Sequence, residues 1–175
     1  MNLEFIKDEA LRQRTEDSIE YLYTLYEESK GDDKNDLYRT ETYRVIILYT
    51  VSIIEALLFY IYERKGVVIM KIEHKERITL PNSYKNKTVG GKICVLVEKT
   101  TEKTESEISL RELVNFLEKK KVLKKATVKK LLNLIQTRNS VHLRQKSETI
   151  CNIQSVEKAL DLLAYVLIQA PRHLK

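Results

Sequence analysis

The chain has 175 residues, a typical length for one domain with its own hydrophobic core, so we expect a single domain over residues 1–175. Hydrophobic residues make up 43% of it, which excludes wholesale disorder, and only four glycines and two prolines occur, which favours long helices over a many-turned β protein. The net charge of +6 is uneven: residues 1–36 hold five basic and eleven acidic residues, whereas residues 107–146 hold eleven basic and three acidic ones, so only the second region attracts phosphate.

Two long helices are predicted in the N-terminal part of the chain. Apolar residues recur at helical spacing over residues 3–29, and the polar turn GDDKND ends this helix. Asp36 is available to cap the second helix, which spans about 37–65 and stops at Gly66.

The second helix contains the apolar stretch YRVIILYTVSIIEALLFYIY, residues 43–62, which approaches the length of a membrane span. Glu55 lies near its middle and both flanks are basic, so we predict a helix buried on nearly all sides and no membrane partner. Eight of the ten tyrosines fall between residues 21 and 62, mostly at apolar helix positions, where we expect core or dimer contacts.

Residues 66–87 carry two β-branched runs, VVIMKI and ERITLP, which predict a short β-hairpin or an extended loop inserted between helices. The segment that follows, TVGGKICVLVEKT, is open to two interpretations. A helix capped by Thr88 would place several apolar residues on one face, whereas the alternation after Gly91 suits a strand.

Three further helices are predicted in the C-terminal half. One starts at Ser109, the next begins near Thr127 and leads into Arg138, and the last covers about 154–168 and ends before Pro171. Together with the first two, these helices are joined by short polar turns. We therefore predict an all-α fold, an antiparallel helical bundle.

The cysteines give evidence on the compartment. Cys94 and Cys151 match no disulfide framework and no metal or redox spacing, so we expect reduced thiols. The N-terminus carries charges where a signal peptide needs an apolar core. Together these features predict a cytoplasmic protein.

The stretch TRNSVHLRQ, residues 137–145, holds the strongest candidate site. Residues four apart lie on one face of a helix, so Arg138 and His142 can serve one site, with Asn139 beside them. Cleavage of RNA by its own 2′-hydroxyl needs a base, a cation for the charge on phosphate and an acid, and no metal or other cofactor. His142, with a reference pKa of about 6.5, suits the base or the acid, Arg138 suits phosphate, and Asn139 could orient either.

Two considerations bear on this interpretation. Cations and caps near a helix C-terminus are favoured by the helix dipole alone, so the cluster could be structural. One histidine is also too few to act as both base and acid, and a two-fold dimer would supply a second copy of His142.

A lysine-rich stretch, EKKKVLKKATVKK, lies just upstream of this motif. Alone it is most simply a solvated face, but near a phosphate-binding motif it could follow an RNA backbone with strong salt dependence. The candidate RNA-binding residues are Lys119, Lys120, Lys121, Lys124, Lys125, Lys129, Lys130 and Arg144.

A long helix with SIIEALLFYI, then TVGGKICVLVEK, then an apolar helix ending LLNLIQTRNSVHL resembles the HEPN family of small helical bundles. Many HEPN proteins are metal-independent RNases, often toxins of toxin–antitoxin or phage-defence systems, that act as dimers with a composite cleft. The resemblance implies Arg138, Asn139 and His142 as catalytic residues, Glu55 as a supporting one, a homodimer, RNA as substrate and an antitoxin protein as partner.

Two alternatives stay open beside this resemblance. Only three residues separate Arg138 from His142, one fewer than the usual minimum in the family, so a non-catalytic HEPN-like module that binds a partner protein or RNA is the second hypothesis. Glu55 could equally be a buried carboxylate satisfied by a tyrosine hydroxyl or an arginine, because a lone buried charge is unfavourable.

Overall fold

The computed structural model describes residues 3–79, 94–141 and 151–174. The chain is mostly helical, as predicted, and carries one small two-stranded antiparallel sheet in its described part. It divides into two compact units. A bundle unit consists of Met1–Gly66 with Leu110–Lys175, and a hairpin unit consists of Val67–Ser109.

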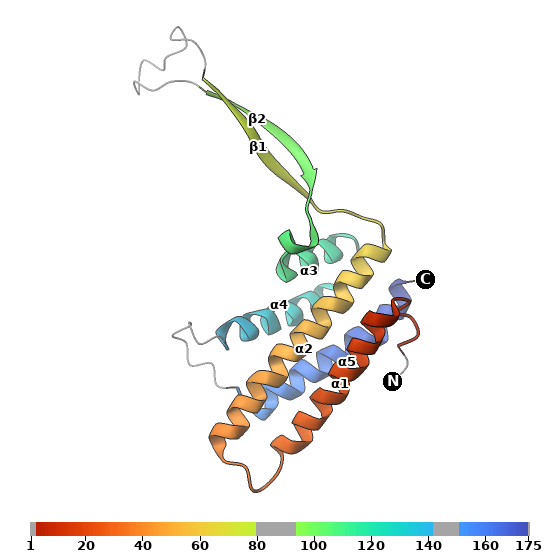
Figure 1. Ribbon diagram of the computed structural model, residues 1–175, viewed down its shortest axis with the longest axis vertical. Coiled ribbons are helices and arrows are strands. Elements are labelled where there is room, and N and C mark those ends of the chain that lie inside the picture. The colour runs from red at the N-terminus through yellow and green to blue at the C-terminus, as the bar shows by residue number, and fades with distance from the viewer. Residues whose placement is uncertain (1–2, 80–93, 142–150, 175) are drawn as a thin grey trace. The chain divides into compact units, whose positions relative to one another are not determined.

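The bundle unit contains the long helices (Figure 1). In chain order these are α1 (Glu9–Ser29), α2 (Asp36–Arg64), α3 (Leu110–Lys119), α4 (Lys125–Ser140) and α5 (Ile153–His173). Figure 1 shows α1, α2 and α5 running alongside one another as long rods, with the shorter α3 and α4 lying obliquely to them.

The central helix of this unit is α2. It packs against α1, α3, α4 and α5, and side chains such as Ile47, Leu57 and Leu58 are completely buried. The prediction of a helix buried on nearly all sides is therefore confirmed, and this position explains why the helix is apolar almost all round. By length and composition α2 is also able to cross a membrane, although 61% of its most apolar window of 18 residues is buried inside the bundle.

α1 begins six residues later than its periodicity predicts. The side chain of Asp8 accepts a hydrogen bond from the Leu11 N–H at 2.9 Å, so Asp8 is the N-cap and Glu9 the first helical residue. Leu3 and Ile6 precede the cap and are still buried. Their apolar spacing reflects burial of a non-helical segment, and the helix predicted from residue 3 was too long.

Other helix limits differ from the prediction by small amounts. The N-cap of α2 is Asn35, which accepts from the Tyr38 N–H at 2.8 Å, rather than Asp36. The predicted end of α5 before Pro171 is wrong, because the helix continues to His173. Pro171 lies in the last turn, where its missing N–H removes one hydrogen bond near the helix end.

The turn between α3 and α4 has a left-handed residue that is not glycine. Lys121 has φ of 59°, its N–H donates to the Glu118 carbonyl at 2.8 Å, and the Val122 N–H donates to the Leu117 carbonyl at 2.9 Å. These two bonds form a Schellman motif, and Val122 and Leu117 are both buried, as the motif's apolar contact requires.

The hairpin unit is built from β1 (Met70–Thr79) and β2 (Cys94–Glu102). They pair antiparallel, from Met70 opposite Glu102 to Thr79 opposite Cys94. A hairpin or a loop within residues 66–87 was predicted here, and an antiparallel strand pair is present. It is not the predicted hairpin, because parts of both β-branched runs belong to β1 and the partner strand lies after residue 87. The partner strand β2 comes from TVGGKICVLVEKT, for which both a helix and a strand were considered. From Cys94 onward the strand is confirmed and the helix is wrong. Thr88, the expected cap of that helix, lies outside the described residues.

Tyrosine burial follows the position of each helix. Tyr60 and Tyr62 on α2 are buried as predicted, whereas Tyr21 and Tyr23 on α1 are 44% and 67% exposed. Tyr38 and Tyr49 are exposed as well, so the prediction of core positions is wrong for these four in the monomer. α1 packs against α2 and also reaches α5, where the Tyr26 hydroxyl donates to Glu157 at 3.4 Å. The rest of its surface is not covered by another helix, and this explains the exposure of its tyrosines.

Candidate functional site

Arg138 lies in the last turn of α4, on the side of the helix that faces the core. It follows Leu131 by seven residues and Leu134 by four, which places the three on one side. Both leucines are buried and Arg138 is half-buried. Its guanidinium forms no ion pair with any residue in the described parts of the chain, and Nη1 donates to Asn139 Oδ1 at a long 3.5 Å. No carboxylate of the described residues thus neutralises this partly desolvated cation.

The end of α4 presents further polar groups. The Ser140 hydroxyl donates to the Thr137 carbonyl at 2.7 Å, and the Val141 N–H donates to the same carbonyl at 3.2 Å. Asn139 is half-buried beside Arg138. A cation in this last turn is also favoured by the helix dipole. His142 and Arg144, the other motif residues, lie outside the residues that the structure describes.

Glu55 lies in the middle of α2 and is half-buried. We expected either a supporting role or a buried carboxylate satisfied by a tyrosine or an arginine. Over residues 3–79, 94–141 and 151–174 it forms no hydrogen bond or ion pair, with Arg138 or with any other residue. Partial exposure lets water solvate this carboxylate where the described residues offer no partner.

The lysine-rich stretch does not form one patch. Lys119, Lys120 and Lys121 lie at the end of α3 and in the turn after it, where the Lys120 ammonium sits 5.5 Å from the centre of the Phe116 ring. Lys124, the N-cap residue of α4, and Lys130 line a groove, whereas Lys125 and Lys129 on α4 are exposed and do not line it. Helical geometry therefore divides the predicted RNA-binding lysines between different faces.

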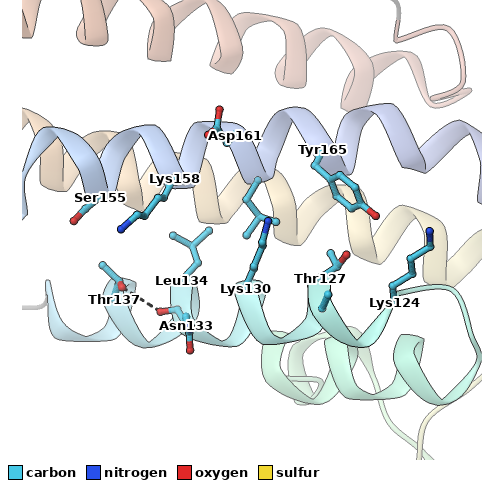
Figure 2. Close-up of a pocket in the computed structure, with 13 residues that line it drawn as sticks. Lys124, Thr127, Lys130, Asn133, Leu134, Thr137, Ser155, Lys158, Asp161 and Tyr165 are labelled. Atoms are coloured by element: carbon cyan, nitrogen blue, oxygen red, sulfur yellow. Dashed lines mark hydrogen bonds between the residues drawn. The ribbon is translucent and has the colours of Figure 1, made fainter.

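The groove runs between α4 and α5 and has a volume of about 860 Å³ (Figure 2). Its floor is formed by side chains that are buried in the bundle: Thr127 and Leu134 from α4, and Ala159 and Leu162 from α5. A volume of this size and an apolar floor with polar groups around it are typical of ligand-binding sites.

The walls of the groove carry cations from both helices. Lys130 extends from α4 toward α5, and Lys158 and Tyr165 extend from α5 toward α4, as Figure 2 shows. Lys124 lies at the Tyr165 end of the groove. Asp161 also lines the groove, but it points away from α4. Three ammonium groups against one carboxylate give the groove a net positive charge.

Sequence reasoning missed the part of this groove that α5 contributes. Lys158 and Tyr165 are seven residues apart, a spacing that places both on one face of a helix. That signal was present in the sequence, but nothing in the sequence says that this face lies against Lys130. No group of three or more His, Cys, Asp or Glu side chains able to hold a metal ion occurs within the described ranges.

The two cysteines are free thiols. Cys151 is buried just before α5, and burial raises the pKa of its thiol, while the nearby Arg44 guanidinium acts in the opposite direction. The thiol therefore stays protonated, in keeping with a structural rather than a reactive cysteine.

Comparisons of this chain with protein-family models, with curated proteins and with solved structures each give no match. The features that bear on function are therefore Arg138, its neighbours and the groove.

Proposed function

We propose that this protein is a metal-independent endoribonuclease whose catalytic residues are Arg138, Asn139 and His142. The observation that supports the proposal most is the half-buried Arg138 guanidinium, which has no carboxylate partner among the described residues. A structural arginine at such a position would normally be paired, because an unpaired buried charge is unfavourable. A phosphate group of RNA is the partner that its planar, bidentate guanidinium fits best.

In the proposed reaction His142 removes the proton from a ribose 2′-hydroxyl. The 2′-oxygen then bonds to the adjacent phosphorus while the bond from phosphorus to the 5′-oxygen breaks, and an acid protonates that leaving oxygen. The products are a 2′,3′-cyclic phosphate end and a 5′-hydroxyl end. Arg138 binds the phosphate oxygens on which negative charge builds, and Asn139 orients the guanidinium or the phosphate.

A second imidazole is supplied in this proposal by a second copy of the chain. Each chain has one histidine in the RNSVH motif, and a two-fold dimer brings two copies of Arg138 and His142 to one composite site. On the resemblance of RNSVH to the HEPN motif, we propose that the enzyme acts in a cytoplasmic toxin or defence system and has an antitoxin protein as a partner.

The test compares purified wild-type protein with Arg138→Ala and His142→Ala, each incubated with total cellular RNA in EDTA. We expect wild type to yield fragments with cyclic phosphate ends, and both variants to be slower by at least about a hundredfold. Arg111→Ala is the matched control, since Arg111 is an exposed arginine on α3 outside the site. Intact RNA with wild type, or equal cleavage by the variants, contradicts the proposal.

A second candidate function, from a different class, is binding of RNA or a partner protein without cleavage. It is favoured by the short spacing of the motif, with three residues between Arg138 and His142. In that case the wild-type protein leaves RNA whole while Arg138→Ala still weakens binding. The cleavage assay and a binding assay on the same variants therefore separate the two functions.

A further inference from the structure

We infer that the groove between α4 and α5 binds an unpaired RNA strand, with lysines at its phosphates and Tyr165 stacked on a base. The inference rests on the proposed function, because it names the form of RNA that the site at Arg138 receives. It extends that proposal to residues of α5 that the motif does not include.

The positive charge of the groove favours an anionic ligand. Lys124, Lys130 and Lys158 form no ion pair with any residue in the described parts of the chain, so their charges are free for a ligand. Asp161, the acidic residue among those that line the groove, points away from α4 (Figure 2). Ammonium groups along a groove displace the cations that surround an RNA backbone, and this release of counterions is the main driving force of backbone binding.

The length of the groove favours an extended ligand. It reaches along α4 from Lys124 to Thr137, and thirteen residues of helix span about 20 Å. Several nucleotides of a single strand fit in that length, whereas a compact mononucleotide would leave most of the groove empty. The apolar floor, which includes Leu134 and Leu162, suits the faces of bases rather than ions alone.

Tyr165 explains why the strand should be unpaired. Its ring is half-buried, points toward α4 and lies near Lys124 at one end of the groove. In a duplex the base faces are occupied by stacking, so an aromatic side chain has nothing to stack on, whereas the bases of a single strand are free. A phosphate beside Lys124 and a base on Tyr165 match the arrangement of a single-strand site.

The opposite end of the groove leads to the candidate catalytic residues. Thr137 lines this end and immediately precedes Arg138 in α4. Lys158 and Ser155 line the same end from α5, as Figure 2 shows. A strand that leaves the groove here therefore comes close to the end of α4, where its next phosphate can meet Arg138.

The experiment measures RNA binding rather than cleavage, with the full chain carrying His142→Ala so that the RNA stays intact. The probe is a fluorescently labelled single-stranded oligoribonucleotide, and fluorescence anisotropy gives its Kd over a range of salt concentrations. The same oligonucleotide annealed to its complement is the duplex control. We expect at least tenfold tighter binding of the single strand.

The decisive comparison uses two neighbouring lysines on one helix. Lys130→Glu removes a groove lysine, whereas Lys129→Glu makes the same change of charge on a residue outside the groove. We expect Lys130→Glu and Lys158→Glu to weaken binding about tenfold each and to lower the salt slope by about 0.7 for each lost phosphate contact. Lys129→Glu should change the Kd by less than about threefold, because it loses only long-range attraction.

Tyr165 is tested by a pair of variants. Tyr165→Ala should weaken binding of the single strand about tenfold, and Tyr165→Phe should bind as the parent does, because stacking needs the ring and not the hydroxyl. The inference is overturned if Lys129→Glu and Lys130→Glu weaken binding equally, if Tyr165→Ala has no effect, or if the duplex binds as tightly as the single strand. A change in oligomeric state instead of RNA affinity in Lys130→Glu overturns it too, since the groove would then hold a protein.

Failure of this inference is distinct from failure of the proposed function. RNA cleavage that depends on Arg138 and His142 but not on Lys130, Lys158 or Tyr165 rejects the groove and keeps the nuclease. Tight single-strand binding in the groove by a protein that never cuts RNA keeps the groove and rejects the nuclease.

Discussion

Leu134 and Arg138 lie one helical turn apart on the same side of α4, and the first is buried while the second is half-buried and charged. Leu134 also lines the groove between α4 and α5. The core, the groove and the candidate catalytic arginine therefore meet along one turn of one helix. This arrangement explains how an apolar helix can end in the polar sequence RNS without losing its packing.

Replacement of Arg138 by methionine should leave the fold intact and remove the activity. The new side chain continues the apolar side formed by Leu131 and Leu134, and this gain offsets the lost attraction between a cation and the helix dipole. We expect the free energy of unfolding to change by less than about 1 kcal/mol, while RNA cleavage falls at least about a hundredfold. Urea denaturation and the cleavage assay measure the two effects.

The comparison for Arg138→Met is Leu131→Ala, which creates a cavity and should lower the free energy of unfolding by about 2–5 kcal/mol. If Arg138→Met lowers it by a similar amount, Arg138 has a structural role rather than a functional one.

Thr50 on α2 is fully buried, and its hydroxyl bonds to no residue in the part of the chain that the structure describes. Thr50→Val keeps the shape and removes the unsatisfied hydroxyl, so the free energy of unfolding should rise by about 1 kcal/mol. Thr15→Val is the matched control, because the buried Thr15 hydroxyl donates to the Leu11 carbonyl at 2.7 Å. The control should lose about 0.5 kcal/mol, and a loss of stability in Thr50→Val would show that its hydroxyl is satisfied.

Lys121 has a left-handed backbone, which any side chain with a Cβ resists. Lys121→Gly should raise the free energy of unfolding by about 1 kcal/mol, because the relief of strain exceeds the entropy that glycine loses on folding. Thermal and urea unfolding give the value. No gain in stability would mean that the turn tolerates lysine without strain.

Gly66 offers the reverse substitution after α2. It has φ of 58°, and a Cβ added there meets no atom within 4 Å. Gly66→Ala should therefore lower the free energy of unfolding by about 1 kcal/mol through backbone strain alone. Opposite signs at residues 66 and 121 would establish backbone conformation as the common cause.

Glu107 in the hairpin unit should titrate far below an ordinary glutamate. The Lys71 ammonium that bonds to it, and the Thr104 N–H that donates to it at 2.9 Å, lower the pKa of Glu107 from 4.5 to about 2. A lowered pKa in the folded state means that this pairing stabilises the hairpin unit fully above pH 4.5 and is lost as the pH falls toward 2. An NMR titration of the side-chain carboxyl carbon gives the pKa directly.

Lys71→Met tests the cause of that shift. It should raise the pKa of Glu107 toward its ordinary value, whereas Lys119→Met, a change at an exposed lysine on α3, should leave it low. A low pKa that persists in Lys71→Met would assign the shift to Thr104 instead.

The candidate site was predictable only in part. The residue types and spacing of Arg138 and Asn139 predict a phosphate-binding motif, and the two residues lie at the end of α4, as their sequence position indicated. Lys129 and Lys130 were predicted together as RNA-binding residues, but neighbouring residues on a helix point about 100° apart, and only Lys130 lines the groove. That Lys158 and Tyr165 stand opposite Lys130 could not be predicted, because it depends on which faces of α4 and α5 pack against each other.

By itself the sequence determined the helices and the central place of α2. Periodicity and caps act over a few residues, and a helix that is apolar on all sides can lie only where other helices cover it. Tertiary structure alone decided that β1 pairs with β2, because the pairing of strands joins residues far apart in the chain and leaves little local signal. It also decided the groove, since two polar helix faces become one site only when packing sets them side by side.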